Sequence, residues 1–330
     1  MFYTIVIPVF NRPDEVDELL QSLCQQTDTN FEVIIVEDGS NVKCDGIVNK
    51  FQDKLQIQYF FKQNSGPGTS RNYGAKLAKG DYIIFFDSDC IIPQNYFKAV
   101  NNFLSEKKVD AFGGPDKAHS SFTNIQKAIN YAMTSFFTTG GIRGGSEKMD
   151  KFYPRSFNMG YSKEVFEVTK GYGTMRFGED IEMSIRIIEN NFSTALIKDA
   201  FVYHKRRTDL KKFFKQVFNS GMARINLMKL HKNSLKIVHL LPSVFVLGCI
   251  SIVLLSVFVN ISFLFLLVFY CLIIFIDSLR LNKNFNVAII SIAASFVQLF
   301  GYGTGFLTAF WKRVIMGNDD AKAFTKNFYK

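Results

Sequence analysis

Short apolar runs alternate with helical patterns along residues 1–115, and this alternation limits the fold more than any other feature of the chain. The runs "YTIVIPVF", "FEVIIVE", "LQIQYFF" and "DYIIFF" have the length of buried strands. The segments between them read as helices, and "PDEVDELLQSLCQQ" places Pro13 and several acids at a helix start. This order predicts an α/β domain with a mostly parallel central sheet.

Carboxylates follow two of these strands. Asp38 comes at the end of the second run, and Asp87 and Asp89 come directly after the fourth. The carboxyl ends of parallel strands meet at one edge of a sheet, where ligands bind, so we expect these acids to lie close together. Two carboxylates one residue apart repel each other, and Mn2+ or Mg2+ would neutralise them and bind phosphate oxygens. An Asp-x-Asp sequence is also common in ordinary turns, so this motif alone leaves both interpretations open.

The segment "NSGPGTSRNYGAK" adds backbone amides and Arg71 to the same edge. Amides at a helix start and a guanidinium are suited to binding phosphate or a base. No Gly-Lys-Ser/Thr follows, so the segment is not a Walker loop and ATP hydrolysis of that type is disfavoured.

The whole chain has a formal net charge of +10. Its charged residues are concentrated in the first two thirds, whereas residues 237–311 contain almost none. A basic block at 198–236 directly precedes the apolar part, which favours a cytoplasmic surface facing anionic lipid over nucleic acid. We therefore expect three regions: a catalytic domain at 1–207, a basic amphipathic interfacial helix at 208–236, and a membrane region at 237–330. The five cysteines have no metal-like spacing and are interpreted as reduced and structural.

The apolar part contains three segments, at about 238–259, 261–276 and 287–310. The first and third are long enough to span a membrane, and the second is near the lower limit. The segments "DSLRLNKNFN" and "WKRVIMGNDDAKAFTKNFYK" are both basic, which places both in the cytoplasm. No secretory signal precedes the first strand, so the catalytic domain is also expected there, at the inner membrane. Three full crossings contradict this placement. The glycines of "FGYGTGF" make the third segment the candidate for a re-entrant or interfacial one, and the side of the C-terminus stays open.

Four stretches carry a resemblance to a known family: "VIPVFNRPDEVDELLQSL", "VEDGS", "NSGPGTSRNYGAKLAKGDYIIFFDSD" and "FGEDIEMSIRI". In this order and at these spacings they resemble family 2 glycosyltransferases over residues 1–207. The resemblance implies the GT-A (nucleotide-diphospho-sugar transferase) fold and a nucleotide-diphospho-sugar donor.

The donor-binding residues that the resemblance implies are Pro8, Asp38, Arg71, Asp87 and Asp89. Asp38 would contact the nucleobase with help from Arg71, Asp87 would lie near the ribose, and Asp89 would bind the metal. A turn or helix-cap aspartate remains the alternative interpretation of Asp38.

The resemblance also assigns the acceptor side. Asp180 would be the general base on the acceptor hydroxyl, with Glu179 beside it, although acids at a helix start are common without any catalytic role. His204 is weighed equally as a metal ligand and as a structural residue. Asn158 and Met159 would line the acceptor pocket, and residues 138–151 would form a lid that orders on sugar binding.

We expect an inverting, metal-dependent enzyme, and the membrane anchor favours a membrane-associated acceptor, such as a lipid-linked glycan or a glycolipid. Processive members carry Gln-x-x-Arg-Trp, but the single tryptophan here, Trp311, follows Phe310, so we expect single additions. Two alternatives stay open: a nucleotidyltransferase of related topology, although a lysine-rich signature is absent, and a non-catalytic membrane scaffold, although the catalytic acids are present.

Overall fold

The computed structural model of the chain describes residues 1–140 and 152–318, which form two compact units. The first unit comprises 1–119 and 152–205, and the second comprises 120–140 and 206–318. The chain thus leaves the first unit at Lys205, and the helix-forming segment that begins at Ser120 groups with the C-terminal helices.

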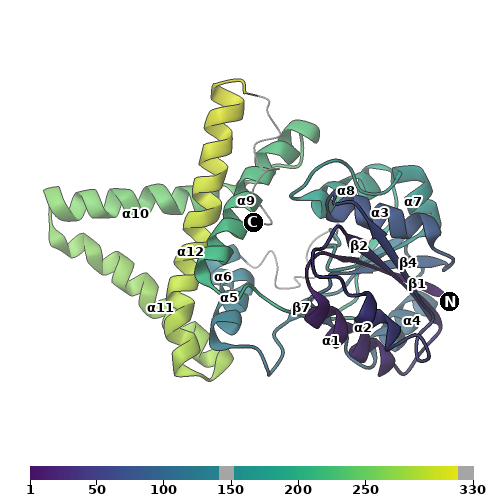
Figure 1. Cartoon of the computed structure of the whole chain (residues 1–330). Helices are drawn as coiled ribbons and strands as arrows, with labels where there is room; N and C mark the ends of the chain where they lie inside the picture. Colours follow the sequence, from purple (N-terminus) through teal and green to yellow (C-terminus); the bar gives the residue numbers. More distant parts are fainter. Residues whose placement is uncertain (141–151, 319–330) are drawn as a thin grey trace. The chain divides into compact units, whose positions relative to one another are not determined.

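A seven-stranded sheet in the order β3-β2-β1-β4-β8-β6-β9 forms the centre of the first unit (Figure 1). Its strands are β1 (Tyr3–Val9), β2 (Phe31–Asp38), β3 (Ile57–Lys62), β4 (Tyr82–Phe86), β6 (Ala111–Gly113), β8 (Asn158–Ser162) and β9 (Thr194–Leu196). All neighbours are parallel except that β8 is antiparallel to both β4 and β6. The prediction of a mostly parallel α/β sheet is confirmed, and the strand order changes direction between β1 and β4, next to the predicted acids.

Both faces of this sheet are covered, because side chains alternate along each strand. Ile5 and Ile7 of β1 face a core shared with α1 (Pro13–Cys24), α2 (Asp45–Asn49) and α4 (Tyr96–Glu106). Val6 faces a second core shared with α3 (Pro67–Leu77), α7 (Lys163–Thr169) and α8 (Glu179–Glu189). The two cores leave the edge of the sheet at the strand ends available for polar side chains.

A second, three-stranded sheet lies beyond the end of β4. It consists of β5 (Cys90–Ile91), β10 (Val202–His204) and β7 (Asp116–Lys117), with β10 in the middle. Strand β10 is antiparallel to β5, and His204 is opposite Cys90. This pairing brings the end of the first unit back to the residues that follow β4.

The second unit is helical (Figure 1). It contains α5 (Asn124–Thr134), α6 (Phe136–Thr139), α9 (Leu210–Leu230), α10 (Leu241–Phe258), α11 (Leu264–Asn282) and α12 (Phe285–Phe310), with short helices η1 (Ile237–His239), η2 (Ile261–Phe263) and η3 (Trp311–Ile315). Among the described residues, three helices are long and apolar enough to cross a membrane, which supports membrane anchoring.

One expectation about the apolar segments is corrected. The second segment is not marginal, because the helical stretch runs from Ile261 to Asn282 over 22 residues. The third is a continuous helix of 26 residues, so its glycines do not break it. They allow backbones to meet: a Cβ added at Gly305 would lie 2.1 Å from the carbonyl oxygen of Phe218 in α9, and one at Gly221 would lie 2.1 Å from that of Tyr302.

Candidate active site

The chain turns immediately after β4, and this turn brings two acids to the same place. The amide of Cys90 donates to the carbonyl oxygen of Asp87 at 3.1 Å, which closes a turn around Ser88. As a result Asp87 Oδ2 and Asp89 Oδ1 lie 4.0 and 3.1 Å from the same atom, Nε2 of His204.

Strand pairing delivers His204 to this turn. The amide of Lys205 donates to the carbonyl oxygen of Asp89 at 3.0 Å, which continues the β10–β5 ladder. The imidazole stacks on the ring of Phe157 with centroids 5.0 Å apart, and its Nδ1 lies 3.9 Å from Asp116 Oδ2. The ring is therefore positioned by a strand and an aromatic face, and the Asp116 carboxylate lies near its second nitrogen, where metal-binding histidines commonly have an acceptor.

The donor set fits a divalent cation. Carboxylate oxygens and an imidazole nitrogen suit Mn2+, and carboxylates alone suit Mg2+. Cys90 also lies within this cluster. Burial raises the pKa of its thiol well above the usual value, and Sγ donates to the carbonyl oxygen of Phe157 at 3.5 Å, so the thiol is a poor ligand here. Arg12 lies shortly after the end of β1. Its guanidinium is 3.0 Å from Asp89 Oδ2 and balances part of the negative charge of the acids.

Arg71 joins this cluster to a second pair of acids. Its guanidinium donates to Asp87 Oδ1 at 2.6 Å and to Glu179 Oε1 at 3.1 Å, and the side chain is buried. The face of Tyr172 lies 5.2 Å from the guanidinium carbon. Arg71 thus lies between Asp87 and Glu179, and its polar contacts are with them and not with Asp38.

Glu179 and Asp180 begin α8, after Gly178 in the left-handed conformation. Both are buried, but their surroundings differ. Burial, together with the nearby Asp180, raises the pKa of Glu179 to about 7, and Arg71 offsets this only in part. Burial also acts to raise the pKa of Asp180, but the charge and hydrogen bond of Arg155 outweigh it, so this pKa lies below the usual value.

Arg155 contacts the predicted base directly. Its Nε donates to Asp180 Oδ2 at 2.6 Å, while the amide of Ile181 donates to Asp180 Oδ1 at 2.8 Å. The Arg155 side chain is 32% exposed, whereas that of Arg71 is 4% exposed. The side chains of Asp180 and Glu179 are themselves equally exposed, at 11% each, so the two acids differ in their cationic partners.

The acids at the end of β2 have internal partners. Glu37 accepts hydrogen bonds from Ser40 Oγ, the Cys44 amide and Tyr59 Oη, so it shapes the turn after β2. Asp38 accepts from the amides of Ser65 and Gly66 at 2.9 and 2.8 Å and pairs with Lys62. Asp38 thereby fixes the start of α3.

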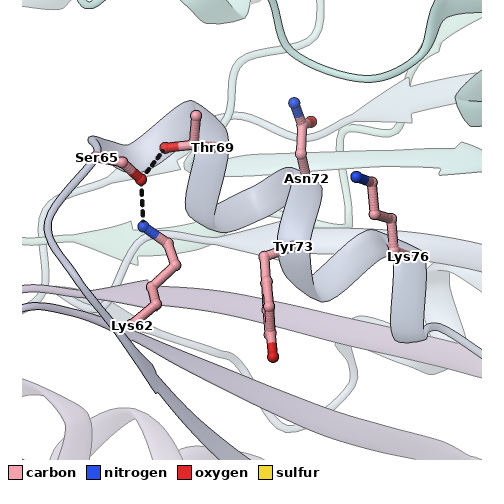
Figure 2. A pocket seen from close by; sticks show the side chains of 6 residues that line it. All are labelled: Lys62, Ser65, Thr69, Asn72, Tyr73 and Lys76. Atoms are coloured by element: carbon pink, nitrogen blue, oxygen red, sulfur yellow. Dashed lines mark hydrogen bonds between the residues drawn. The ribbon is translucent and has the colours of Figure 1, made fainter.

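Figure 2 shows a pocket of about 330 Å3 on the outer face of α3, where Lys62 contacts Ser65 and Ser65 contacts Thr69. Asn72, Tyr73 and Lys76 complete the lining, whereas Arg71 lies on the buried face of the helix. The pocket is therefore separate from the acids at the end of β4.

The remaining predicted residues lie as follows. Pro8 is in β1, next to Val36 of β2. Asn158 and Met159 are fully buried at the start of β8: Asn158 accepts from Tyr96 Oη at 2.6 Å and donates to the Ala200 carbonyl at 2.7 Å. They hold β8 in place instead of facing an open pocket. Most of the predicted lid, residues 141–151, is outside the described residues.

Sequence reasoning missed Arg12, Asp116 and Arg155. Arg12 follows a strand of the parallel sheet, so the rule that located the acids could have located it too. Nothing local distinguishes Asp116 or Arg155, because both reach the site through pairing with distant segments.

Comparisons with known proteins show the family and the fold of this chain. A model described as "Glycosyl transferase family 2" matches residues 4–169. Over 128 residues the chain is 37% identical to an uncharacterized glycosyltransferase of Rickettsia bellii, covering 39% of this chain and 18% of that protein. Over 114 residues it is 33% identical to the poly(ribitol-phosphate) beta-N-acetylglucosaminyltransferase TarS of Staphylococcus aureus, covering 33% of this chain and 20% of TarS.

A solved structure shows the same fold. The mannosyltransferase PcManGT from Pyrobaculum calidifontis, in complex with GDP-Man and Mn2+, aligns with a TM-score of 0.65 and 13% identity over 89% of this chain and 86% of that one. The chain spans less than half of the length of the curated relatives it matches, between 18% and 44%.

Proposed function

Because this chain belongs to glycosyl transferase family 2, we propose that it is an inverting, metal-dependent enzyme that adds single sugars to a membrane-associated acceptor. Family membership makes the chain a glycosyltransferase with a nucleotide-sugar donor, so the nucleotidyltransferase and scaffold alternatives are set aside.

The arrangement of Arg71 carries the proposal. One buried guanidinium contacts both Asp87, next to the candidate metal residues, and Glu179, next to the candidate base. An inverting transfer needs the leaving diphosphate and the attacking hydroxyl on opposite faces of one sugar ring. Arg71 places the candidate metal residues and the candidate base in one site, where one sugar could lie between them.

The donor side rests on Asp87, Asp89 and His204, with Asp38 and Pro8 nearer the nucleobase. A cation held by Asp89 and His204 would supply positive charge to the leaving diphosphate. Arg12 contacts Asp89. It can turn toward a phosphate when that carboxylate binds a cation instead.

The acceptor side rests on Asp180. Its low pKa keeps it ionised, and its partner Arg155 is 32% exposed, so an acceptor could approach it from the Arg155 side. Asp180 would take the proton from the acceptor hydroxyl as that oxygen attacks the anomeric carbon. Glu179 would hold Arg71 in place.

The acceptor is proposed to be a lipid-linked glycan or another envelope glycopolymer, with the catalytic unit in the cytoplasm at the inner membrane. The apolar helices would hold the enzyme where such an acceptor is concentrated. The name of TarS, which refers to poly(ribitol-phosphate), supports a polymer of the cell envelope.

The test is a donor screen followed by product analysis. Thermal shifts of the purified full chain are measured with Mn2+ and a panel of nucleotide sugars that includes GDP-mannose and UDP-N-acetylglucosamine. NMR of the product from the active donor should show the anomeric configuration opposite to that of the donor. Retention of configuration, or equal transfer in EDTA, would contradict the proposal.

A further inference from the structure

The two ends of α12 carry the same kind of charge. Arg280 and Lys283 precede the helix, and Lys312 and Arg313 follow it. If α10, α11 and α12 all crossed a membrane, these two basic segments would lie on opposite sides. Basic segments that flank membrane helices are retained on one side, the cytoplasmic side. The charge pattern therefore indicates an even number of crossings.

Helix α12 lies alongside α9, in the same direction (Figure 1). Gly301 of α12 meets Val217 and Phe214, Gly305 meets Phe218, and Arg313 beyond α12 bonds to Asn226. The contacts thus advance along both helices together, with backbone atoms close enough that only glycine fits at Gly305. Whatever depth α9 has in a membrane, α12 shares it.

Helix α9 is too charged to lie in hydrocarbon. It carries Lys211, Lys212, Lys215, Arg224 and Lys229. Its longest stretch without a basic residue, from Lys215 to Arg224, covers about 14 Å at roughly 1.5 Å per residue, against a hydrocarbon core of about 30 Å. The polar Gln216, Asn219 and Ser220 also lie within that stretch. A helix of this kind lies in the interface.

Helices α10 and α11 have the opposite character. No charged residue occurs between Leu240 and Ile276. Only 17% and 11% of their most apolar stretches are buried, against 44% for α12. Phe258 and Phe265, near the connection between the two helices, are 80% and 73% exposed. Apolar surface of this extent requires a lipid covering.

The two helices form a hairpin that opens onto α12 (Figure 1). The start of α10 packs closely on α12. A Cβ added at Gly303 would lie 2.5 Å from the carbonyl oxygen of Pro242. Near the end of α11, Ser278 Oγ lies 2.7 Å from Ser291 Oγ. These contacts are about 18 Å apart along α12 at roughly 1.5 Å per residue, so α12 runs across the open end of the hairpin.

Polar side chains gather at this open end. Tyr131 of α5 donates to Asp277 Oδ2 at 2.9 Å, and Arg280 pairs with Asp277 at 3.0 Å. Tyrosine and paired charges are typical of the membrane–water boundary. The 18 residues of α10 are about 27 Å long, close to the thickness of the hydrocarbon core.

From these observations we propose that α10 and α11 alone enter the bilayer, as a hairpin, while α12 lies in the interface beside α9. Both ends of the hairpin and the segment after α12 are then on one side of the membrane, the side on which the chain preceding α10 remains. Phospholipid acyl chains cover the exposed apolar surface of the hairpin.

Epitopes in the full-length protein test the sidedness. One epitope is inserted after Lys283 and another is placed at the C-terminus, in separate proteins. Both should be inaccessible to antibody in intact spheroplasts and accessible in inside-out vesicles. A C-terminal epitope on the opposite side from the Lys283 epitope would overturn the proposal, because α12 would then cross.

Depth is measured with single tryptophans. Trp311→Phe removes the native one, and Ile250→Trp, Leu272→Trp and Ala293→Trp each place one near the middle of α10, of α11 or within α12. In vesicles with lipids brominated at defined acyl positions, Ile250→Trp and Leu272→Trp should be quenched best by deep bromines. Ala293→Trp should be quenched best by shallow ones. Equal depth for all three would refute an interfacial α12 even if the epitope result agreed.

Discussion

The adjacent acids at the start of α8 give different pH profiles depending on which of them is the base. With its pKa raised to about 7, Glu179 would be only about 1% ionised at pH 5 and about 90% ionised at pH 8. Asp180, whose pKa lies below its usual 3.8, would be more than about 90% ionised at pH 5. A Glu179 base therefore predicts a rate loss of roughly 90-fold between pH 8 and 5, and an Asp180 base predicts almost none.

The assay is kcat/KM for the donor from pH 5 to 8.5, because this ratio reports ionisations of the free enzyme. Metal is kept saturating throughout. We expect a nearly flat profile, a loss of about 100- to 10,000-fold in Asp180→Asn with donor binding retained, and a milder loss in Glu179→Gln. An acidic limb near pH 7 together with an inactive Glu179→Gln would refute the assignment of Asp180 and make Glu179 the base.

Thermal melts check the Glu179 pKa separately from catalysis. A folded-state pKa above the unfolded value contributes stability that is fully present below about pH 4.5 and is lost as pH rises through about 7. The full effect is roughly 3 kcal/mol at most. Glu179→Gln should therefore melt higher than the wild type at pH 8, with the advantage disappearing toward pH 4.5. Equal melting temperatures of the two proteins at pH 8 would show that ionisation of the Glu179 carboxylate does not destabilise the folded protein.

Three other substitutions have defined outcomes. Asp89→Ala should lose Mn2+-dependent donor binding, measured by calorimetry with and without EDTA, and unchanged binding would exclude it as a ligand. Arg155→Met should raise the pKa of Asp180 by removing its cation, so an acidic limb should enter the pH profile, and Arg155→Lys should restore part of the flat profile. Gly305→Leu should lower the Tm of the detergent-solubilised protein by several degrees because α9 must move away. The control Gly248→Leu, where an added Cβ would meet open space, should leave the Tm unchanged. Equal shifts in the two variants would contradict the close packing.

The sequence predicted the sheet and the acidic edge well, since both follow from local patterns. The strand runs, the Pro13 helix start and the position of Asp87 and Asp89 at a strand end each depend on neighbouring residues only. By contrast, the place of His204 depends on β10 pairing with β5 across more than a hundred residues, so only the resemblance pointed to it. The antiparallel insertion of β8 likewise has no signature in its own five residues.

The helical part shows what local reading cannot provide. Glycine costs about 1 kcal/mol in an isolated helix, so "FGYGTGF" looks like an interruption. The close approach of α9 at Gly301 and Gly305 offsets that cost, and no property of α12 alone reveals it. In the same way, α5 has an evident apolar stripe, but the sequence does not show that Ala128, Ile129 and Ala132 pack with α9 and α12.

The position of His204 at the exit of the first unit has a consequence for how the enzyme is made. On the ribosome, Asp87 and Asp89 emerge more than a hundred residues before His204, and the sheet segments β6, β8 and β9 are synthesised in between. A nascent chain therefore cannot assemble the proposed three-residue cation site until nearly all of the catalytic unit has been translated. Cation affinity would then mark completion of this unit, just before the apolar hairpin emerges and needs a membrane.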